Sequence, residues 1–249
     1  MDRRIALLGI FFVMLSLLTA GCLVPPNSGN ATVQNLTFRI GMGTNPVLGS
    51  DGAAIAIVEF TDYQCPYCRQ HATETFPQIE QNYVNTGRVK YYLRDFPLEF
   101  HPNSRNGATA ARCAGDQGKY WEMHSLLFQK QDEWSGLSGS DLVAKFSSYA
   151  DSLGLNTAQY NSCYSAGKAG AISADIADGQ EYGIAGTPSS IIILPRTANE
   201  TRLLGILAAY PQYASQGILA LGKDPDGKYV FFIKGAFPYQ IFQQALDSS

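Results

Sequence analysis

The chain has 249 residues, of which 45% are hydrophobic and 16% charged, a composition that excludes disorder for most of its length. Its 18 Lys and Arg residues against 21 Asp and Glu residues give a formal net charge of −3, so we expect no nucleic-acid partner. Five cysteines are too few for a disulfide-built scaffold, although Cys65 and Cys68 form a close pair.

The N-terminal residues have the pattern of a secretory signal. A short cationic start precedes an apolar run over residues 5–18, and small residues lead to Cys22. This run is shorter than the about 20 apolar residues of a membrane-spanning helix. We predict a signal peptide over residues 1–21 and lipidation of Cys22; an uncleaved anchor, or an ordinary cleavage site that leaves Cys22 free, are the alternatives. Residues 22–50 then form a tether and lead-in, polar and turn-rich at first, and the protein is expected to be extracytoplasmic.

The next segment, residues 51–102, has the pattern of a strand–helix–strand unit. Residues 53–60 are a nearly unbroken apolar run, typical of a strand buried on both faces. A helix-compatible stretch extends from the cysteine pair to about Asn85, and Pro77 should kink or end it. Residues 88–93 are predicted to form the second strand, and a strand–helix–strand unit of this kind requires parallel strands joined by a right-handed crossover.

Residues 103–183 have a helical pattern throughout. Gly, Ser and Asn residues divide this stretch into separate segments. Candidate helices span residues 106–116, 120–130, 140–153, 157–165 and 169–182. The pattern therefore predicts a helical insertion between two halves of an α/β fold.

Residues 184–249 return to strand character. Strands are predicted at residues 189–194 and 229–233, and Pro238 stands near the start of a last helix. The stretch 196–228 is longer than a hairpin connection. We expect it to be a surface loop, with a docking element as the alternative.

The cysteine pair lies between a predicted strand and a predicted helix, so the Cys65 sulfur is expected at the helix N-terminus. Pro66 fits the first helical turn, where the amides of Tyr67 and Cys68 have no partner within the helix. Lowering a thiol pKa from about 8.5 to about 5.5 requires about 4 kcal/mol, and a helix dipole supplies at most about 2. Direct hydrogen bonds, including one from Cys68, must supply the rest. We therefore predict Cys65 as the attacking sulfur and Cys68 as the buried resolving partner.

A Cys-x-x-Cys pair also occurs in zinc knuckles and in inert structural bridges. Zinc needs two further ligands in a compatible arrangement. The rest of the chain offers only isolated cysteines and three histidines. We therefore expect redox chemistry at this pair, with no metal and no other cofactor.

The sequence around the pair resembles the active-site region of DsbA-like thioredoxin-fold proteins. Five motifs occur in the expected order: residues 45–49, 58–68, 113–124, 183–188 and 235–239. The resemblance implies an α/β thioredoxin fold with a helical domain inserted between its two halves. It also implies thiol:disulfide oxidoreductase activity on exported proteins.

The resemblance implies further site residues. Thr187-Pro188 matches the cis-proline loop that faces the cysteine pair, where free backbone would pair with an extended substrate segment. Glu59 matches the buried acid beneath the pair; apolar surroundings should raise its pKa and make it a proton acceptor for Cys68. A solvated residue at a strand end is the alternative for Glu59. Tyr67 stands where the strongly oxidising bacterial enzyme has His, so a less oxidising couple is expected.

Two further cysteines, Cys113 and Cys163, lie on predicted helices of the insertion. An exported chain seldom leaves two thiols idle, and related proteins often carry a second, structural disulfide at similar places. We therefore expect a structural bridge, worth about 4 kcal/mol in the chain-entropy model. Two free buried thiols or a second redox relay are the alternatives. His71, on the active-site helix, is expected to be partly exposed and receives no chemical role.

Together these features predict an extracytoplasmic thiol:disulfide oxidoreductase that oxidises exported cysteine-containing proteins. A membrane partner must then reoxidise Cys65 and Cys68. One alternative is a reductase or isomerase that receives electrons from the membrane. Another is a non-catalytic thioredoxin-fold module that binds partners or metal through the same groove.

Overall fold

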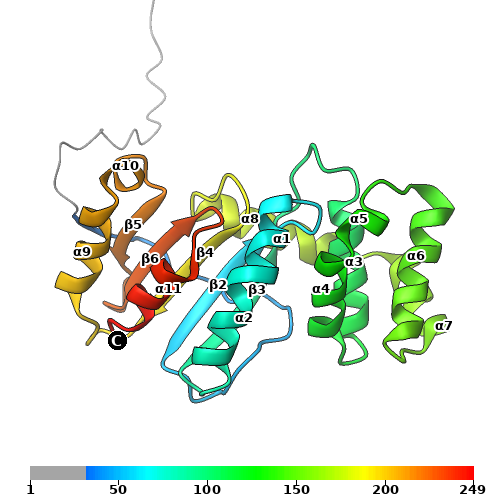
Figure 1. Cartoon of the computed structure of the whole chain (residues 1–249), viewed down its shortest axis with the longest axis horizontal. Coiled ribbons are helices and arrows are strands. Elements are labelled where there is room, and N and C mark those ends of the chain that lie inside the picture. Colours follow the sequence, from blue (N-terminus) through cyan, green and yellow to red (C-terminus); the bar gives the residue numbers. More distant parts are fainter. Residues whose placement is uncertain (1–31) are drawn as a thin grey trace, which may run out of the picture.

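One mixed β-sheet organises residues 32–249, the part of the chain that the computed structural model describes (Figure 1). Its strands follow the spatial order β1-β5-β6-β4-β2-β3. They are β1 (Val33–Asn35), β2 (Ile55–Thr61), β3 (Val89–Asp95), β4 (Ser189–Leu194), β5 (Leu219–Lys223) and β6 (Tyr229–Lys234). The predicted signal peptide over residues 1–21 and Cys22 lie outside the described residues.

Strand pairing brings the two halves of the chain together at the centre of the sheet. β2 pairs in parallel with β3, as the strand–helix–strand pattern requires, and antiparallel with β4. β6 pairs antiparallel with both β4 and β5, while β1 adds a parallel edge strand to β5. The four predicted strands are confirmed, and this register places Glu59 of β2 opposite Leu93 and Ser190. β1 and β5 were not predicted.

The active-site helix continues from Pro66 to Val84 and lies across β2 and β3 (Figure 1). It consists of α1 (Pro66–Gln70), the π-helical η1 (His71–Thr75), α2 (Phe76–Ile79) and the π-helical η2 (Glu80–Val84). Pro77 lacks the N–H that an α-helix requires at an interior position. A π-helical turn precedes it, so the helix widens locally where an end or a kink was expected.

The helical insertion lies beside the β3 edge of the sheet, and its last helix returns behind the sheet (Figure 1). Its helices are α3 (Ser104–Gly115), α4 (Tyr120–Gln129), α5 (Gln131–Trp134), α6 (Gly139–Ser152), α7 (Thr157–Ala166) and α8 (Ala169–Glu181). The five predicted helices are confirmed within two residues at each end, and α5 is an additional short helix. Within the insertion, the aromatic side chains of Phe128, Trp134 and Phe146 are buried. Cys113 and Cys163 form a disulfide that joins α3 to α7.

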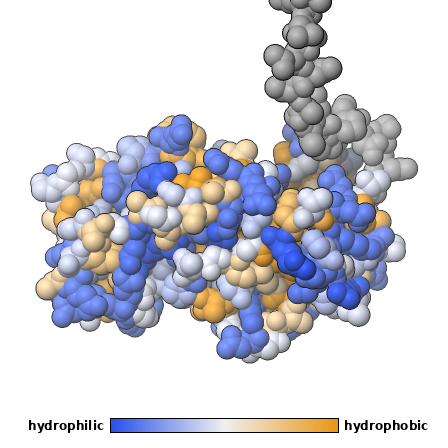
Figure 2. Space-filling view, turned by 180° about the vertical axis from the view of Figure 1, so that it is seen from behind, coloured by the Kyte–Doolittle hydropathy of each residue, from blue (hydrophilic) through white to orange (hydrophobic). Residues whose placement is uncertain are grey.

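The sheet has an apolar core on each face, because successive strand residues point to opposite sides. Ile57 and Ile192 pack on the side of the active-site helix and α11 (Tyr239–Leu246). Val58 and Ile191 pack on the other side, against Ile40 and the end of α8. Figure 2 shows that the surface seen from behind is mixed, with small hydrophobic groups among hydrophilic ones. Within residues 32–249, no helix has the length and apolar character needed to cross a membrane.

The prediction of a surface loop at residues 196–228 is wrong. This segment forms α9 (Glu200–Ala209), α10 (Pro211–Ala214) and strand β5. The Asn199 side chain caps α9 by accepting a hydrogen bond from the amide of Arg202 at 3.0 Å. Leu203 and Leu207 are buried one turn apart on α9. The helix therefore adds to the sheet's core, and the segment is a structural extension of the hairpin between β4 and β6.

The packing of α9 leads to a stability prediction. Leu203 is fully buried, so we expect Leu203→Ala to lower the free energy of unfolding by about 2–5 kcal/mol. Leu204→Ala, on the same helix but only partly buried, is the matched control and should cost less. Urea unfolding followed by circular dichroism measures both. Equal, near-zero losses for the two variants would show that the segment is dispensable.

Candidate active site

The Cys65 sulfur lies at the N-terminus of α1. Cys65 is the N-cap residue, with an extended backbone (φ −72°, ψ 126°), and Pro66 occupies the first turn. Its Sγ lies 3.5 Å from the carbonyl oxygen of Thr187. The pKa of Cys65 is lowered to about 6, chiefly by the hydrogen bond from the Cys68 side chain. The amides of Cys68 and Tyr67 add to this effect, whereas burial opposes it. Direct hydrogen bonds thus stabilise the thiolate.

The second sulfur has the opposite environment. Cys68 is fully buried, and its Sγ accepts a hydrogen bond from the amide of Asp62 at 3.4 Å. Burial, followed by the neighbouring Cys65, raises the pKa of the Cys68 thiol well above its ordinary value. The pair therefore combines one sulfur that ionises near neutral pH with one that keeps its proton. This asymmetry suits stepwise thiol–disulfide exchange.

The loop before β4 faces this pair. Its Thr187–Pro188 peptide bond is cis, and the Pro188 carbonyl accepts a hydrogen bond from the amide of Gly235 at 2.7 Å. Gly235 directly follows β6, and Pro188 directly precedes β4. The loop is therefore held by both of these paired strands. Thr187 consequently sits against Cys65, where the resemblance to DsbA-like proteins placed it.

The loop that leads into Cys65 is held by the buried polar side chains of Gln131 and Asp62. Gln131 of the insertion donates to the backbone carbonyls of Tyr63 at 2.9 Å and Cys65 at 3.1 Å. The buried Asp62 carboxylate lies 2.7 Å from Nδ1 of His101. Asp62 lies within the motif around the cysteine pair, so the sequence could have identified it as a site residue. Gln131 lies far from the pair in sequence and in none of the motifs. The insertion therefore helps to position the cysteine pair.

Glu59 is buried beneath the pair, with 1% of its surface exposed, so the alternative of a solvated strand end is excluded. Tyr91 of β3 donates a hydrogen bond of 2.6 Å to its Oε2. The expectation that His71 is partly exposed is wrong, because His71 is also only 1% exposed. It lies three residues beyond Cys68, on the helix face that packs against the sheet. Sequence reasoning did not identify Tyr91.

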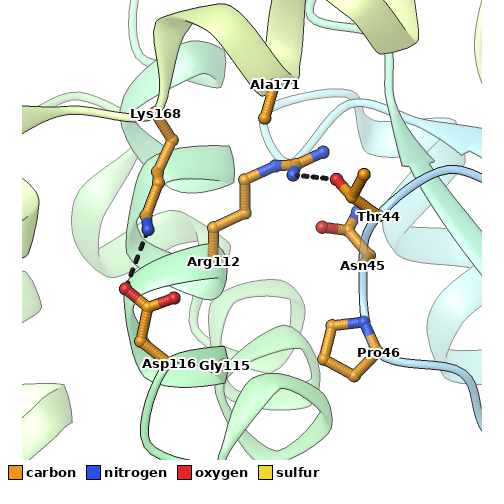
Figure 3. Close-up of a pocket in the computed structure, with 8 residues that line it drawn as sticks. All are labelled: Thr44, Asn45, Pro46, Arg112, Gly115, Asp116, Lys168 and Ala171. Carbon is orange, nitrogen blue, oxygen red and sulfur yellow. Dashed lines mark hydrogen bonds and ion pairs between the residues drawn. The ribbon is translucent and has the colours of Figure 1, made fainter.

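A pocket of about 300 Å³ lies between the lead-in segment and helices α3 and α8, and it shares no residue with the cysteine pair (Figure 3). Arg112 donates to the Thr44 hydroxyl at 3.1 Å and also pairs with Asp95 and Asp175. The other cation of the pocket, Lys168, pairs with Asp116 at 2.8 Å. Because both cations are already neutralised by carboxylates, we assign no ligand to this pocket. Its lining residues are Thr44, Asn45, Pro46, Arg112, Gly115, Asp116, Lys168 and Ala171.

The environment of Cys65 predicts its reactivity. We expect its alkylation rate by iodoacetamide to rise through a midpoint of about pH 6, because the thiolate is the reacting form. Cys68→Ala removes the largest stabilising hydrogen bond and should raise this midpoint by about one unit or more. Gln70→Ala, an exposed change on α1, is the control and should not move it. Mass spectrometry of the labelled peptides gives the rates. A wild-type midpoint above pH 8 would contradict the assignment.

Parts of the chain are similar to two kinds of known protein. The chain is 36% identical over 91 residues to disulfide bond formation protein D of Bacillus subtilis, covering 35% of this chain and 40% of that protein. It is 33% identical over 148 residues to Na(+)/H(+) antiporter NhaA 3 of Salinispora tropica, covering 59% of this chain and 21% of the antiporter. The chain thus spans less than half of the length of either relative.

A solved structure and a family model define the fold. The crystal structure of α-DsbA1 from Wolbachia pipientis matches with a TM-score of 0.62 and 21% identity, over 84% of this chain and 92% of that one. A family model described as thioredoxin matches residues 42–200, more than half of the chain. The chain therefore belongs to this thioredoxin family, and its fold is the DsbA-like thioredoxin fold with an inserted helical domain.

Proposed function

We propose that the protein is a thiol:disulfide oxidoreductase of the DsbA type that oxidises exported proteins outside the cytoplasm. The asymmetry of the two sulfurs is the observation that carries this proposal. Cys65 is a stabilised thiolate and a good leaving group at neutral pH, while Cys68 is buried in the core and has a raised pKa. The names of relatives such as disulfide bond formation protein D support the same activity.

The proposed reaction begins with the Cys65–Cys68 disulfide. A substrate thiolate attacks the Cys65 sulfur, the bond to Cys68 breaks, and Cys68 leaves with a proton because its pKa is high. A second substrate thiolate then attacks the substrate sulfur of this mixed disulfide. Cys65 leaves as a thiolate, and the substrate gains a disulfide. Two electrons now reside on the cysteine pair, and a membrane partner must remove them.

Substrate binding is proposed to use the cis-proline loop and the exposed surface around it. Thr187 lies against Cys65, so its backbone is placed to pair with an extended segment next to a substrate cysteine. Tyr67 lies between the two cysteines and is 63% exposed, which makes its ring available to apolar substrate side chains. Pro66 fixes the first turn of α1 beside it. Unfolded exported proteins, which present extended cysteine-containing segments, fit this surface.

Location outside the cytoplasm is supported by sequence and by covalent structure. The N-terminal pattern over residues 1–21 is that of a signal peptide, and we propose that lipidated Cys22 holds the mature protein at the membrane. The Cys113–Cys163 disulfide is of the kind that persists in oxidising compartments. Anchoring would keep the pair close to a membrane-bound reoxidant.

The lowered pKa of Cys65 favours the oxidase direction. At pH 7, a thiol with a pKa of about 6 stabilises the reduced form by about 1.4 kcal/mol relative to an ordinary thiol. That energy makes the disulfide more oxidising by about 30 mV. The stabilisation is fully present above the ordinary thiol pKa and is lost as the pH falls through about 6.

These energies predict the reduction potential. Thioredoxin, with a cysteine pKa near 7, has a potential of about −270 mV, and DsbA, with a pKa near 3.5, about −120 mV. The Cys65 pKa of about 6 lies between the cysteine pKa values of these two proteins. Interpolating between their potentials, we expect roughly −250 to −190 mV for the Cys65–Cys68 couple at pH 7. Equilibration with glutathione buffers, read out by thiol alkylation, measures it. A value at or below about −270 mV would favour the reductase alternative.

Trapping tests the catalytic role of each sulfur. We expect Cys68→Ser to accumulate mixed disulfides with exported proteins, because its Cys65 thiolate attacks their disulfides and the variant lacks the Cys68 thiol that would release the adduct. Cys65→Ser is the matched control and should trap nothing. Non-reducing electrophoresis of acid-quenched cells shows the adducts. A Cys65→Ser variant that retains full biological activity would instead indicate a binding module.

A further inference from the structure

A chain of buried polar groups lies beneath Cys68, on the face of β2 and β3 that the active-site helix covers. The hydroxyl of Tyr91 donates to Oε2 of Glu59 at 2.6 Å and lies 3.1 Å from Nε2 of His71. The same Nε2 is 3.8 Å from Oε2 of Glu59. All three side chains are buried. An imidazole, a phenol and a carboxylate thus meet at the buried side of the cysteine pair.

Hydrogen counting fixes the direction of these bonds. Tyr91 has one hydroxyl hydrogen, which it gives to Glu59, so its oxygen must accept a hydrogen from Nε2 of His71. His71 then carries its hydrogen on Nε2, and its buried Nδ1 has no partner among residues 32–249. Burial lowers the pKa of His71, in keeping with a neutral ring. Oε1 of Glu59 is likewise buried without a partner in the described structure.

We propose that His71 and Tyr91 are positioning residues that hold the Glu59 carboxylate through its Oε2 and leave Oε1 to take the proton of the Cys68 thiol, directly or through one water. This step rests on the proposed oxidoreductase function and on the proton-acceptor role that the resemblance to DsbA-like proteins implies for Glu59; the roles of His71 and Tyr91 are the new part. The Cys68 proton moves to Oε1, the Cys68 sulfur attacks Cys65, and the bond between Cys65 and the substrate sulfur breaks. The substrate sulfur leaves with the electron pair. In the opposite direction, Glu59 returns the proton as Cys68 departs.

Apart from the two cysteines, other titratable groups near Glu59, His71 and Tyr91 do not exchange a proton at neutral pH. His124 of α4 is the other histidine nearby, and its pKa is lowered to about 3 by burial and then by His71, so it stays neutral. Tyr63 is also buried, and burial raises its pKa well above the ordinary value. From α11, the Phe242 ring packs on His71 at 5.3 Å between centroids and brings no charge. Among the groups named here, Glu59 is the one with a buried carboxylate oxygen that has no partner within residues 32–249.

The test measures resolution of a mixed disulfide between Cys65 and glutathione in the full-length protein. Reduced protein is mixed with oxidised glutathione, and acid-quenched mass spectra give the rates of adduct formation and of its resolution by Cys68. We expect His71→Phe and Tyr91→Phe to slow resolution about tenfold at pH 6–7 and to move the acidic limb of its pH profile upward by about one unit. His71→Gln keeps an N–H donor and should restore most of the rate.

A double-variant comparison separates positioning from general structural support. In a Glu59→Gln background, His71→Phe should produce no further loss of the resolution rate, because both changes remove the same proton acceptor. Additive losses, or equal slowing of adduct formation and resolution with unchanged pH midpoints, would overturn the inference. A wild-type protein that exchanges no disulfide with glutathione would instead overturn the proposed function.

The tautomer of His71 gives a test that needs no substitution. Nitrogen-15 spectra of the reduced wild-type protein should show a neutral His71 ring with its hydrogen on Nε2 at pH 7. A ring with its hydrogen on Nδ1, or a charged ring, is incompatible with the proposed bond to Tyr91.

Discussion

The difference in ionisation between two sulfurs three residues apart is the constraint on which the rest of the site depends. Cys65 stands outside the first turn of α1, where amides and the Cys68 side chain point at its sulfur. Cys68 stands inside that turn and faces the core, where a negative charge has little solvation. One helix N-terminus therefore produces both effects, since the amides of its first turn stabilise a charge on Cys65, whereas Cys68, three residues further on, faces the core.

The remaining architecture keeps this helix start in place. The antiparallel β4 and β6 present the cis-proline loop to Cys65 from one side. From the other side, Gln131 of the insertion binds the carbonyl of the residue at the cap itself. The insertion can do so because a buried ion network fixes it to β3, with Arg94 bonded to Asp175 of α8. Breaking one partner of such a network leaves an unpaired buried charge, which is strongly destabilising. The insertion is thus held firmly enough to act as part of the site.

Local patterns accounted for much of this structure, and tertiary contacts for the rest. The cysteine motif, the apolar strands and the insertion helices each depend on a short stretch of sequence, and all of them were predicted. The signals of α9, namely the Asn199 cap and the buried Leu203, were also local, but the unusual length of the segment suggested a loop. By contrast, Gln131 and Tyr91 act through contacts across 66 and 32 residues of sequence. No spacing rule connects such positions before the fold brings them together.

Burying the polar side chains of Glu59, His71 and Tyr91 beneath Cys68 lowers the stability of the fold. β2 is otherwise an apolar strand, and an apolar side chain at Glu59 would avoid the desolvation of a carboxylate. The donor from Tyr91 compensates only one of its two oxygens, since Oε1 remains without a partner within residues 32–249. A buried carboxylate oxygen without a donor lowers the stability of the folded state. In the proposed proton transfer this oxygen is the acceptor for the Cys68 thiol, which is buried and cannot release its proton directly to water.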